Sequence, residues 1–122
     1  MNLSLFERIG GDAAVEAAVN KFYVKFMQQP EIIDFFSDVS QPLQIEKMRN
    51  FLTLALTGDT EYNRDAIRLA HAPLVERGLN DRHLNIFIQI MHESLLELDI
   101  PQELVEEFIA VTEEYRLDVL NR

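Results

Sequence analysis

The residues of this sequence that could do chemistry are few. The chain has no cysteine, which excludes disulfides, thiolate catalysis and iron–sulfur clusters. Its histidines lack the His-x-x-x-His spacing of zinc sites, and neither a Glu-x-x-His pair of the di-iron type nor a glycine-rich phosphate loop is present. A metal ion held by several side chains is therefore not expected. A prosthetic group that needs a single protein ligand is compatible with the sequence.

His71 is the strongest candidate for that single ligand. It follows two apolar residues, lies just before Pro73 and occupies a short segment between two long predicted helices. The other histidines have simpler explanations, because His83 lies directly behind a predicted helix cap and His92 lies in the middle of a helix. By position alone, a histidine that only caps or lines the core is the more common case.

A few residues elsewhere could form a pocket around such a group. Tyr23 lies on an apolar helix face, and its hydroxyl needs a partner if it is buried. Gln44 and Met48 are one helical turn apart and share a stripe, and the corner at Phe35-Phe36 could clamp a flat ring. An apolar pocket with a few convergent polar groups suits a small polar ligand. A core tyrosine bonded to a backbone carbonyl would explain Tyr23 equally well.

The elements that must position these residues are all expected to be helices. Apolar residues recur at helical spacing in four long segments, and strand alternation and repeats are absent. The predicted long helices cover residues 12–28 (capped by Asp12), 40–56, 80–98 and 101–120. Shorter helical pieces are expected at residues 5–9 and 31–36 and around His71, with a hinge at Gly10-Gly11, a loop over residues 58–65 and a stop at Gly78.

Length and composition indicate one domain over residues 1–122. Apolar residues make up 48% of the chain and the formal charge is -10, with no cluster of lysine or arginine. Such a surface repels phosphate backbones and anionic lipids, so neither nucleic-acid nor membrane binding is expected. The first residues lack the basic flank and apolar stretch of a signal peptide. We therefore expect a cytoplasmic protein, and a monomer.

The candidate residues lie within a series of short motifs that runs through nearly the whole chain. On these motifs the sequence resembles the truncated haemoglobins, and most closely their group I members. The motifs, in the order in which that family carries them, are Leu5-Phe-Glu-Arg-Ile-Gly-Gly11, Val19-Asn-Lys-Phe-Tyr23, Phe35-Phe-Ser-Asp-Val39, Gln44 to Phe51-Leu-Thr53, Arg68-Leu-Ala-His71, Leu74-Val75, Gly78-Leu-Asn80 through His83, and Asp118-Val-Leu-Asn121.

This resemblance implies a truncated globin fold, a two-over-two helical sandwich that encloses a haem b. His71 would be the proximal iron ligand, and neutral imidazole is well suited to that position. The ligand-binding residues on the opposite face would be Tyr23, Gln44 and Met48. Further haem contacts are expected from Phe36, Gln44, Met48, Phe51, Leu52 and Phe87, with Lys47 and Arg68 placed to meet the haem propionates.

The function implied by the resemblance is binding of dioxygen, as in oxygen transport, and also of nitric oxide or carbon monoxide, at an iron that can be five-coordinate. One alternative is nitric oxide dioxygenase activity, which would need an external reductase because the chain has no flavin or nicotinamide domain. A haem-free helical interaction module is an alternative from another class.

Some positions depart from the family pattern or have two interpretations. Met48 stands where group I members often have a second glutamine, so it supplies no strong hydrogen-bond donor. No histidine follows His92, so a C-terminal link to a haem vinyl group is excluded and the haem should be non-covalent. Lys47 could instead coordinate the sixth iron position, although that requires the neutral amine, which is the minor form of lysine at neutral pH.

Overall fold

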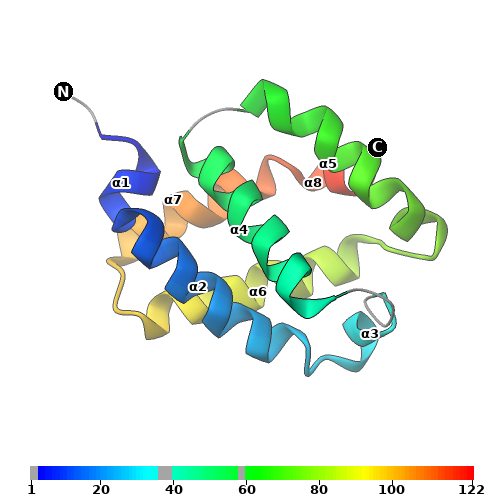
Figure 1. The fold of residues 1–122 in the computed structure, drawn as a ribbon, viewed down its shortest axis with the longest axis horizontal. Coiled ribbons are helices and arrows are strands. Elements are labelled where there is room, and N and C mark those ends of the chain that lie inside the picture. The colour runs from blue at the N-terminus through cyan, green and yellow to red at the C-terminus, as the bar shows by residue number, and fades with distance from the viewer. Residues whose placement is uncertain (1–2, 36–39, 58–59) are drawn as a thin grey trace.

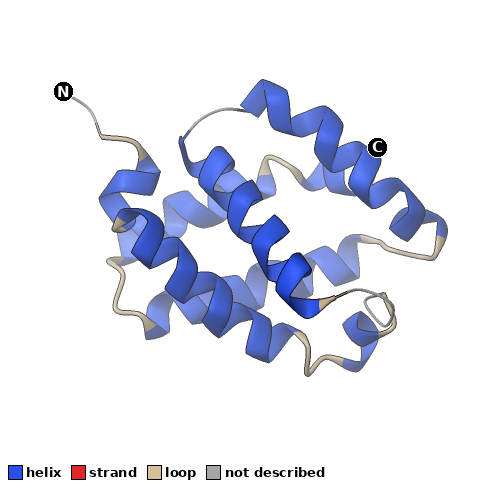
Figure 2. Cartoon of the chain, in the orientation of Figure 1, coloured by secondary structure: helices blue, strands red, loops and turns tan. Residues whose placement is uncertain are grey.

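The structure, a computed structural model, describes residues 3–35, 40–57 and 60–122. Eight helices make up most of these residues. Within these ranges there is no strand (Figure 1, Figure 2), so the all-α prediction is confirmed. No helix in this part of the chain is long and apolar enough to cross a membrane. In chain order the helices are α1 (Leu5–Ile9), α2 (Gly11–Phe26), α3 (Pro30–Ile33), α4 (Gln41–Thr57), α5 (Thr60–Glu76), α6 (Asp81–Glu97), α7 (Gln102–Glu113) and α8 (Arg116–Val119).

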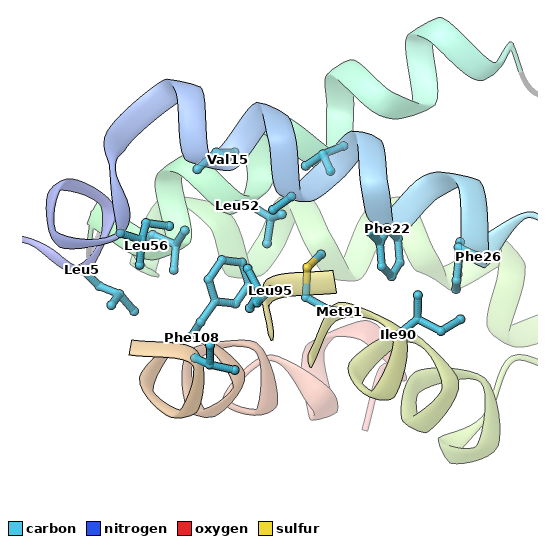
Figure 3. Packing of buried hydrophobic residues seen from close by; sticks show 14 of the residues in the cluster. Leu5, Val15, Phe22, Phe26, Leu52, Leu56, Ile90, Met91, Leu95 and Phe108 are labelled. Atoms are coloured by element: carbon cyan, nitrogen blue, oxygen red, sulfur yellow. The ribbon is translucent and has the colours of Figure 1, made fainter. Parts of the chain in front are cut away.

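Two pairs of helices face each other across the main core. α2 packs on α4 and α6 packs on α7, while α2 also contacts α6. Figure 3 shows the buried side chains between α2 at the top and α6 and α7 at the bottom. This arrangement is the two-over-two helical sandwich that the resemblance implied, and the fold prediction is confirmed.

The apolar spacing in α2 explains how this core forms. Val15, Val19, Phe22 and Phe26 are three or four residues apart, so they share one face of the helix, and all four are buried. Across the layer, Phe108 of α7 is fully buried in the same cluster. Burying a large apolar side chain contributes roughly 1.5–3 kcal/mol, so packing between the layers supplies most of the stability of these helices.

The start of α2 differs from the prediction. The helix begins at Gly11 with Gly10 as its N-cap, so Asp12 lies inside the first turn and is not the cap. Gly10 has a φ of +121°, and a Cβ atom there would come within 3.0 Å of the Cβ of Ala14. Only glycine fits this backbone conformation without strain. The expected hinge between α1 and α2 is therefore present, and the N-cap lies two residues earlier than predicted.

α5 is longer than predicted. The expected loop over residues 58–65 was wrong for residues 60–65, because α5 is a 17-residue helix that runs from Thr60 to Glu76 and carries His71. The segment is polar, with few apolar residues to reveal its period, and Pro73 lies inside it. α5 packs most closely against α4 and α8, so contacts distant in sequence stabilise it. The predicted stop is confirmed: Gly78, with a φ of +107°, follows the last turn, and the amide of Leu79 donates to the carbonyl of Leu74 at 2.9 Å.

The last predicted helix, over residues 101–120, is divided in the structure. α7 ends at Glu113, and the short α8 begins only at Arg116. Tyr115, between them, is buried, and its ring meets the ring of Phe51 edge-on at 5.2 Å. The break turns α8 so that it packs beneath α5, as Figure 1 shows. The periodicity did not predict this break, because neither proline nor glycine marks it.

Two predicted helix starts are confirmed. α4 begins directly after Ser40, whose carbonyl accepts from the amide of Gln44 at 3.0 Å. Asn80 caps α6, and its side chain accepts from the amide of Arg82 at 2.9 Å. His83 completes a capping box, because its Nδ1 accepts from the amide of Asn80 at 3.1 Å. The structure thus gives His83 a helix-capping role, where its position alone had suggested a surface or helix-packing residue.

Candidate functional site

His71 lies on α5 with its imidazole ring held in one orientation. Its Nδ1 is 2.8 Å from the carbonyl oxygen of Ile67, one helical turn earlier. A carbonyl can only accept, so Nδ1 carries the proton and Nε2 presents a free lone pair. Burial lowers the pKa of His71 below its usual value, and the hydrogen bond to Ile67 offsets this only in part. The ring is therefore neutral at neutral pH, which is the form that binds a metal ion.

Two polar side chains on α2 and α4 have no hydrogen-bond partner within the part of the chain that the structure describes. Tyr23 on α2 is only 6% exposed, yet no described residue bonds its hydroxyl. Burial raises the pKa of Tyr23, so the hydroxyl stays protonated and can donate. The half-buried Gln44 on α4 likewise has no described partner for its amide group. Because no described residue occupies them, both groups are available to hydrogen-bond a bound ligand.

The apolar residues predicted to contact the haem lie on two helices. Met48 and Phe51 on α4 and Phe87 on α6 are half-buried and pack against the edge of the main core. The Phe87 ring meets the Phe22 ring edge-on at 4.8 Å. Leu52 is fully buried inside the core, and Figure 3 shows its side chain there. Phe36, the predicted clamp on a flat ring, lies outside the described residues.

The two basic residues predicted at the propionates have different surroundings. Lys47 is exposed on α4, and no ion pair to it occurs among the described residues. The Nε of Arg68 donates to Oδ1 of Asp118 at 2.8 Å, so this guanidinium is already paired within the protein. Asp118 is a residue whose contact with α5 the sequence reasoning missed, because the two residues lie 50 positions apart.

The helices that carry the predicted residues are neighbours. α4 packs against α2 on one side and against α5 on the other, as Figure 1 shows. Tyr23, Gln44 and Met48 therefore come from the adjacent α2 and α4, and His71 comes from the facing helix. Nowhere in the described ranges do three or more histidine or acidic side chains form a group that could hold a metal ion. The predicted residues on these helices are one neutral imidazole, two polar side chains without a described partner and several apolar side chains, which are the kinds of group that an iron porphyrin needs.

A second set of contacts that the sequence did not reveal lies around Arg77. The guanidinium of Arg77 donates to the carbonyl of Asp34 at 2.6 Å and lies 5.4 Å above the centre of the Phe35 ring. The same ring meets His83 edge-on at 5.0 Å. These contacts join the segment after α3 to the turn between α5 and α6 and to the first turn of α6. No sequence signal predicted them, since the partners are more than 40 residues apart.

The sequence of this chain is similar to those of known proteins over nearly its whole length. A sequence model of the bacterial-like globin family matches residues 4–121. A group 1 truncated haemoglobin of Synechocystis is 37% identical over 122 residues, and the match covers 98% of each chain. A group 1 truncated haemoglobin of Tetrahymena thermophila is 29% identical over 119 residues, covering 98% of this chain and 96% of the relative.

Solved structures agree with the sequence relatives. The 2/2 haemoglobin of Synechococcus sp. PCC 7002, in the cyanomet state and with covalently attached haem, is 34% identical with a TM-score of 0.87, and the match covers 98% of this chain and 100% of that one. The Fe(III) form of a truncated haemoglobin from Tetrahymena pyriformis is 28% identical with a TM-score of 0.84, covering 97% and 98%. This similarity implies a haem cofactor and gaseous ligands.

Proposed function

This chain belongs to the bacterial-like globin family, and we propose that it holds a non-covalent haem b through His71 and binds dioxygen on the opposite face. The bound haem iron would supply reversible coordination of a small diatomic gas. The observation that carries the proposal is the hydrogen bond of 2.8 Å from His71 Nδ1 to the carbonyl of Ile67. That bond fixes the tautomer and the ring direction, as second contacts to metal-ligating histidines usually do.

The polar groups of α2 and α4 account for ligand discrimination. Tyr23 is buried and protonated, and neither its hydroxyl nor the Gln44 amide is satisfied by a described residue. Both can donate a hydrogen bond to a ligand that carries partial negative charge, as dioxygen does when bound. A neutral donor contributes about 0.5–1.5 kcal/mol, and more toward a charged acceptor. Two donors would slow oxygen release by on the order of a hundredfold, with a much smaller effect on the less polar carbon monoxide.

Met48 limits the size of this donor set. It is half-buried against the core edge, and a thioether offers no strong donor. We therefore assign Met48 a packing role beside the ligand. Apolar walls from Met48, Phe51 and Phe87 would exclude water from the bound gas, and Leu52 would support Phe51 from inside the core.

The charged residues lead us to divide the propionate roles differently from the sequence prediction. Lys47 is exposed and has no described ion-pair partner, so it is available to a propionate. Arg68 is already paired with Asp118 at 2.8 Å. We assign propionate pairing to Lys47 and a structural role to Arg68.

The haem should be removable. A covalent link to a haem vinyl group would need a second histidine, and the sequence contains only three. If His71 is the iron ligand and His83 caps α6, only His92 on α6 is left without a role. Extraction of the reconstituted protein with acidic butanone should transfer all of the haem into the organic phase. Haem that stays with the protein after extraction would contradict non-covalent binding.

Reconstitution with haemin tests the proposal directly. The wild-type chain should develop a Soret band at one haem per chain. His71→Gly should lose most of the haem or hold it loosely, and added imidazole should restore the ferrous five-coordinate spectrum. His92→Ala, a change to a half-buried histidine of α6, serves as the matched control and should bind haem normally. Equal Soret bands in both variants, with no response to imidazole, would exclude His71 as the ligand.

Kinetics on the ferrous protein separate oxygen binding from nitric oxide consumption. Slow oxygen release together with rapid loss of nitric oxide, in the presence of a reductase, would establish the dioxygenase. A wild-type chain that shows no Soret band after reconstitution would establish the haem-free interaction module.

A further inference from the structure

A buried carboxylate on α8 holds the helix that carries His71. Asp118 is only 3% exposed. Its Oδ2 accepts from Nη1 of Arg64 at 2.6 Å, and its Oδ1 accepts from Nε of Arg68 at 2.8 Å. Both arginines belong to α5. Each carboxylate oxygen therefore accepts a hydrogen bond from a different guanidinium. A buried ion pair is stable when its carboxylate oxygens are hydrogen-bonded in this way.

The end of the chain strengthens this attachment. Nη2 of Arg68 donates to the carbonyl of Arg122 at 3.0 Å, and the side-chain amide of Asn121 donates to the carbonyl of Arg68 at 3.1 Å. The guanidinium of Arg122 in turn pairs with Asp81 at 2.6 Å, at the start of α6. Residue 68 is thus held through both its side chain and its backbone, by groups that are fixed to the rest of the fold.

The attached residues lie on the same face of α5 as His71. Arg64, Arg68 and His71 are four and three residues apart, so their side chains follow one stripe of the helix. Ile67, whose carbonyl holds the imidazole, directly precedes Arg68. The helices packed most closely against α5 are α4 and α8. A polar helix of 17 residues is marginal by itself, so the ion pairs with α8 are a main determinant of where His71 points.

We propose that Asp118 is a positioning residue, which fixes α5 on α8 and thereby sets the direction in which His71 presents Nε2 to the haem iron. This inference rests on the proposed function. It assigns the short C-terminal helix a part in cofactor retention, although no residue of α8 need touch the cofactor. Changes to such outer contacts of a metal ligand weaken metal binding by roughly 10–100-fold.

The test compares Asp118→Asn with Glu107→Gln. Glu107 pairs with Arg8 at 2.7 Å between α7 and α1, so its change removes an ion pair that does not involve α5. Ferric protein loaded with haem is mixed with excess apomyoglobin. We expect Asp118→Asn to lose haem about tenfold faster than wild type, and Glu107→Gln to match wild type. Arg68→Lys keeps the charge but loses the planar guanidinium that reaches both Asp118 and the carbonyl of Arg122. Its rate of haem loss should lie between those of Asp118→Asn and wild type.

Two further measurements distinguish positioning from general stability. Resonance Raman spectra of the ferrous protein should show a shifted or broadened iron–histidine band in Asp118→Asn and not in Glu107→Gln. In the haem-free chains, hydrogen exchange should rise along α5 in Asp118→Asn and stay unchanged in α2. If Asp118→Asn fails to fold, Arg68→Lys carries the same comparisons.

The outcomes separate this inference from the proposed function. If wild type binds haem but the iron–histidine band and the haem-loss rate of Asp118→Asn match those of the control, the positioning role is wrong and the proposed function stands. A lower melting temperature with an unchanged band would also overturn it, because the contact would then be only structural. If wild type takes up no haem, the proposed function fails, and exchange along α5 still decides whether Asp118 holds that helix.

Discussion

Removing the hydroxyl of Tyr23 should weaken oxygen binding by the haem-loaded protein without lowering the stability of the haem-free protein. The side chain is 6% exposed and has no hydrogen bond to a described residue. Tyr23→Phe thus breaks no hydrogen bond to a described residue, and it removes a polar group from a side chain that is largely buried. In the haem-free protein, Tyr23→Phe should therefore leave the free energy of unfolding unchanged or raise it by up to about 1 kcal/mol.

The same change should accelerate oxygen release from the haem-loaded protein. A hydrogen bond to a partly charged acceptor contributes about 1.5 kcal/mol, and its loss corresponds to a roughly tenfold faster dissociation of oxygen. Stopped-flow displacement of oxygen by carbon monoxide measures this rate, and urea unfolding measures the stability. Autoxidation of the ferrous protein should accelerate as well.

Thr112→Val is the matched control, because it removes a buried hydroxyl that does have a partner. The Thr112 hydroxyl donates to the carbonyl of Ile109 at 2.7 Å. Its loss should cost about 1 kcal/mol of stability and leave the oxygen rate unchanged. If Tyr23→Phe instead behaves like Thr112→Val, with lower stability and unaltered oxygen release, the hydroxyl has a structural partner and our assignment to the ligand is refuted.

Three further changes test other parts of the structure. Because burial lowers the pKa of His71, the unfolded chain takes up the proton first as the pH falls. The stability that this residue contributes to the haem-free protein is therefore complete above the unfolded pKa of about 6.5 and decreases below it, by at most about 1.36 kcal/mol per pH unit. Urea unfolding at pH 7.5 and 5.5 measures this loss, and the difference in the free energy of unfolding between the two pH values should be smaller for His71→Gln than for wild type. An equal difference would contradict the buried neutral ring. Lys47→Ala should accelerate haem loss a few-fold if Lys47 pairs with a propionate, whereas a low-spin ferric form that grows in at alkaline pH and vanishes in the variant would show that Lys47 coordinates the iron. Phe108→Ala, at a fully buried position, should lower the free energy of unfolding by about 3–5 kcal/mol; a loss below 1 kcal/mol would mean that α7 does not complete the core.

The long helices that bear apolar faces could be predicted from the sequence. In α2, the spacing of Val15, Val19, Phe22 and Phe26 shows the buried face directly, and α4 and α6 have their starts marked by Ser40 and Asn80. Such patterns are readable because each helix must bury one stripe against whatever layer faces it. The hydrogen bond from His71 to Ile67 belongs to the same class, since residues four apart in a helix are always neighbours.

Only the tertiary structure revealed what depends on partners far away in the chain. The first part of α5, residues 60–65, was expected to be loop because its sequence is polar, and it is helical in a helix that packs against α4 and α8. The pairing of the Arg68 guanidinium with Asp118, 50 residues later, was not predicted. The sequence motifs predicted which residue types would surround His71, and that prediction stays with the proposed function. The ion pairs that fix its helix were not predicted, because a charge on a polar helix face shows no sign of its partner until the fold brings the two together.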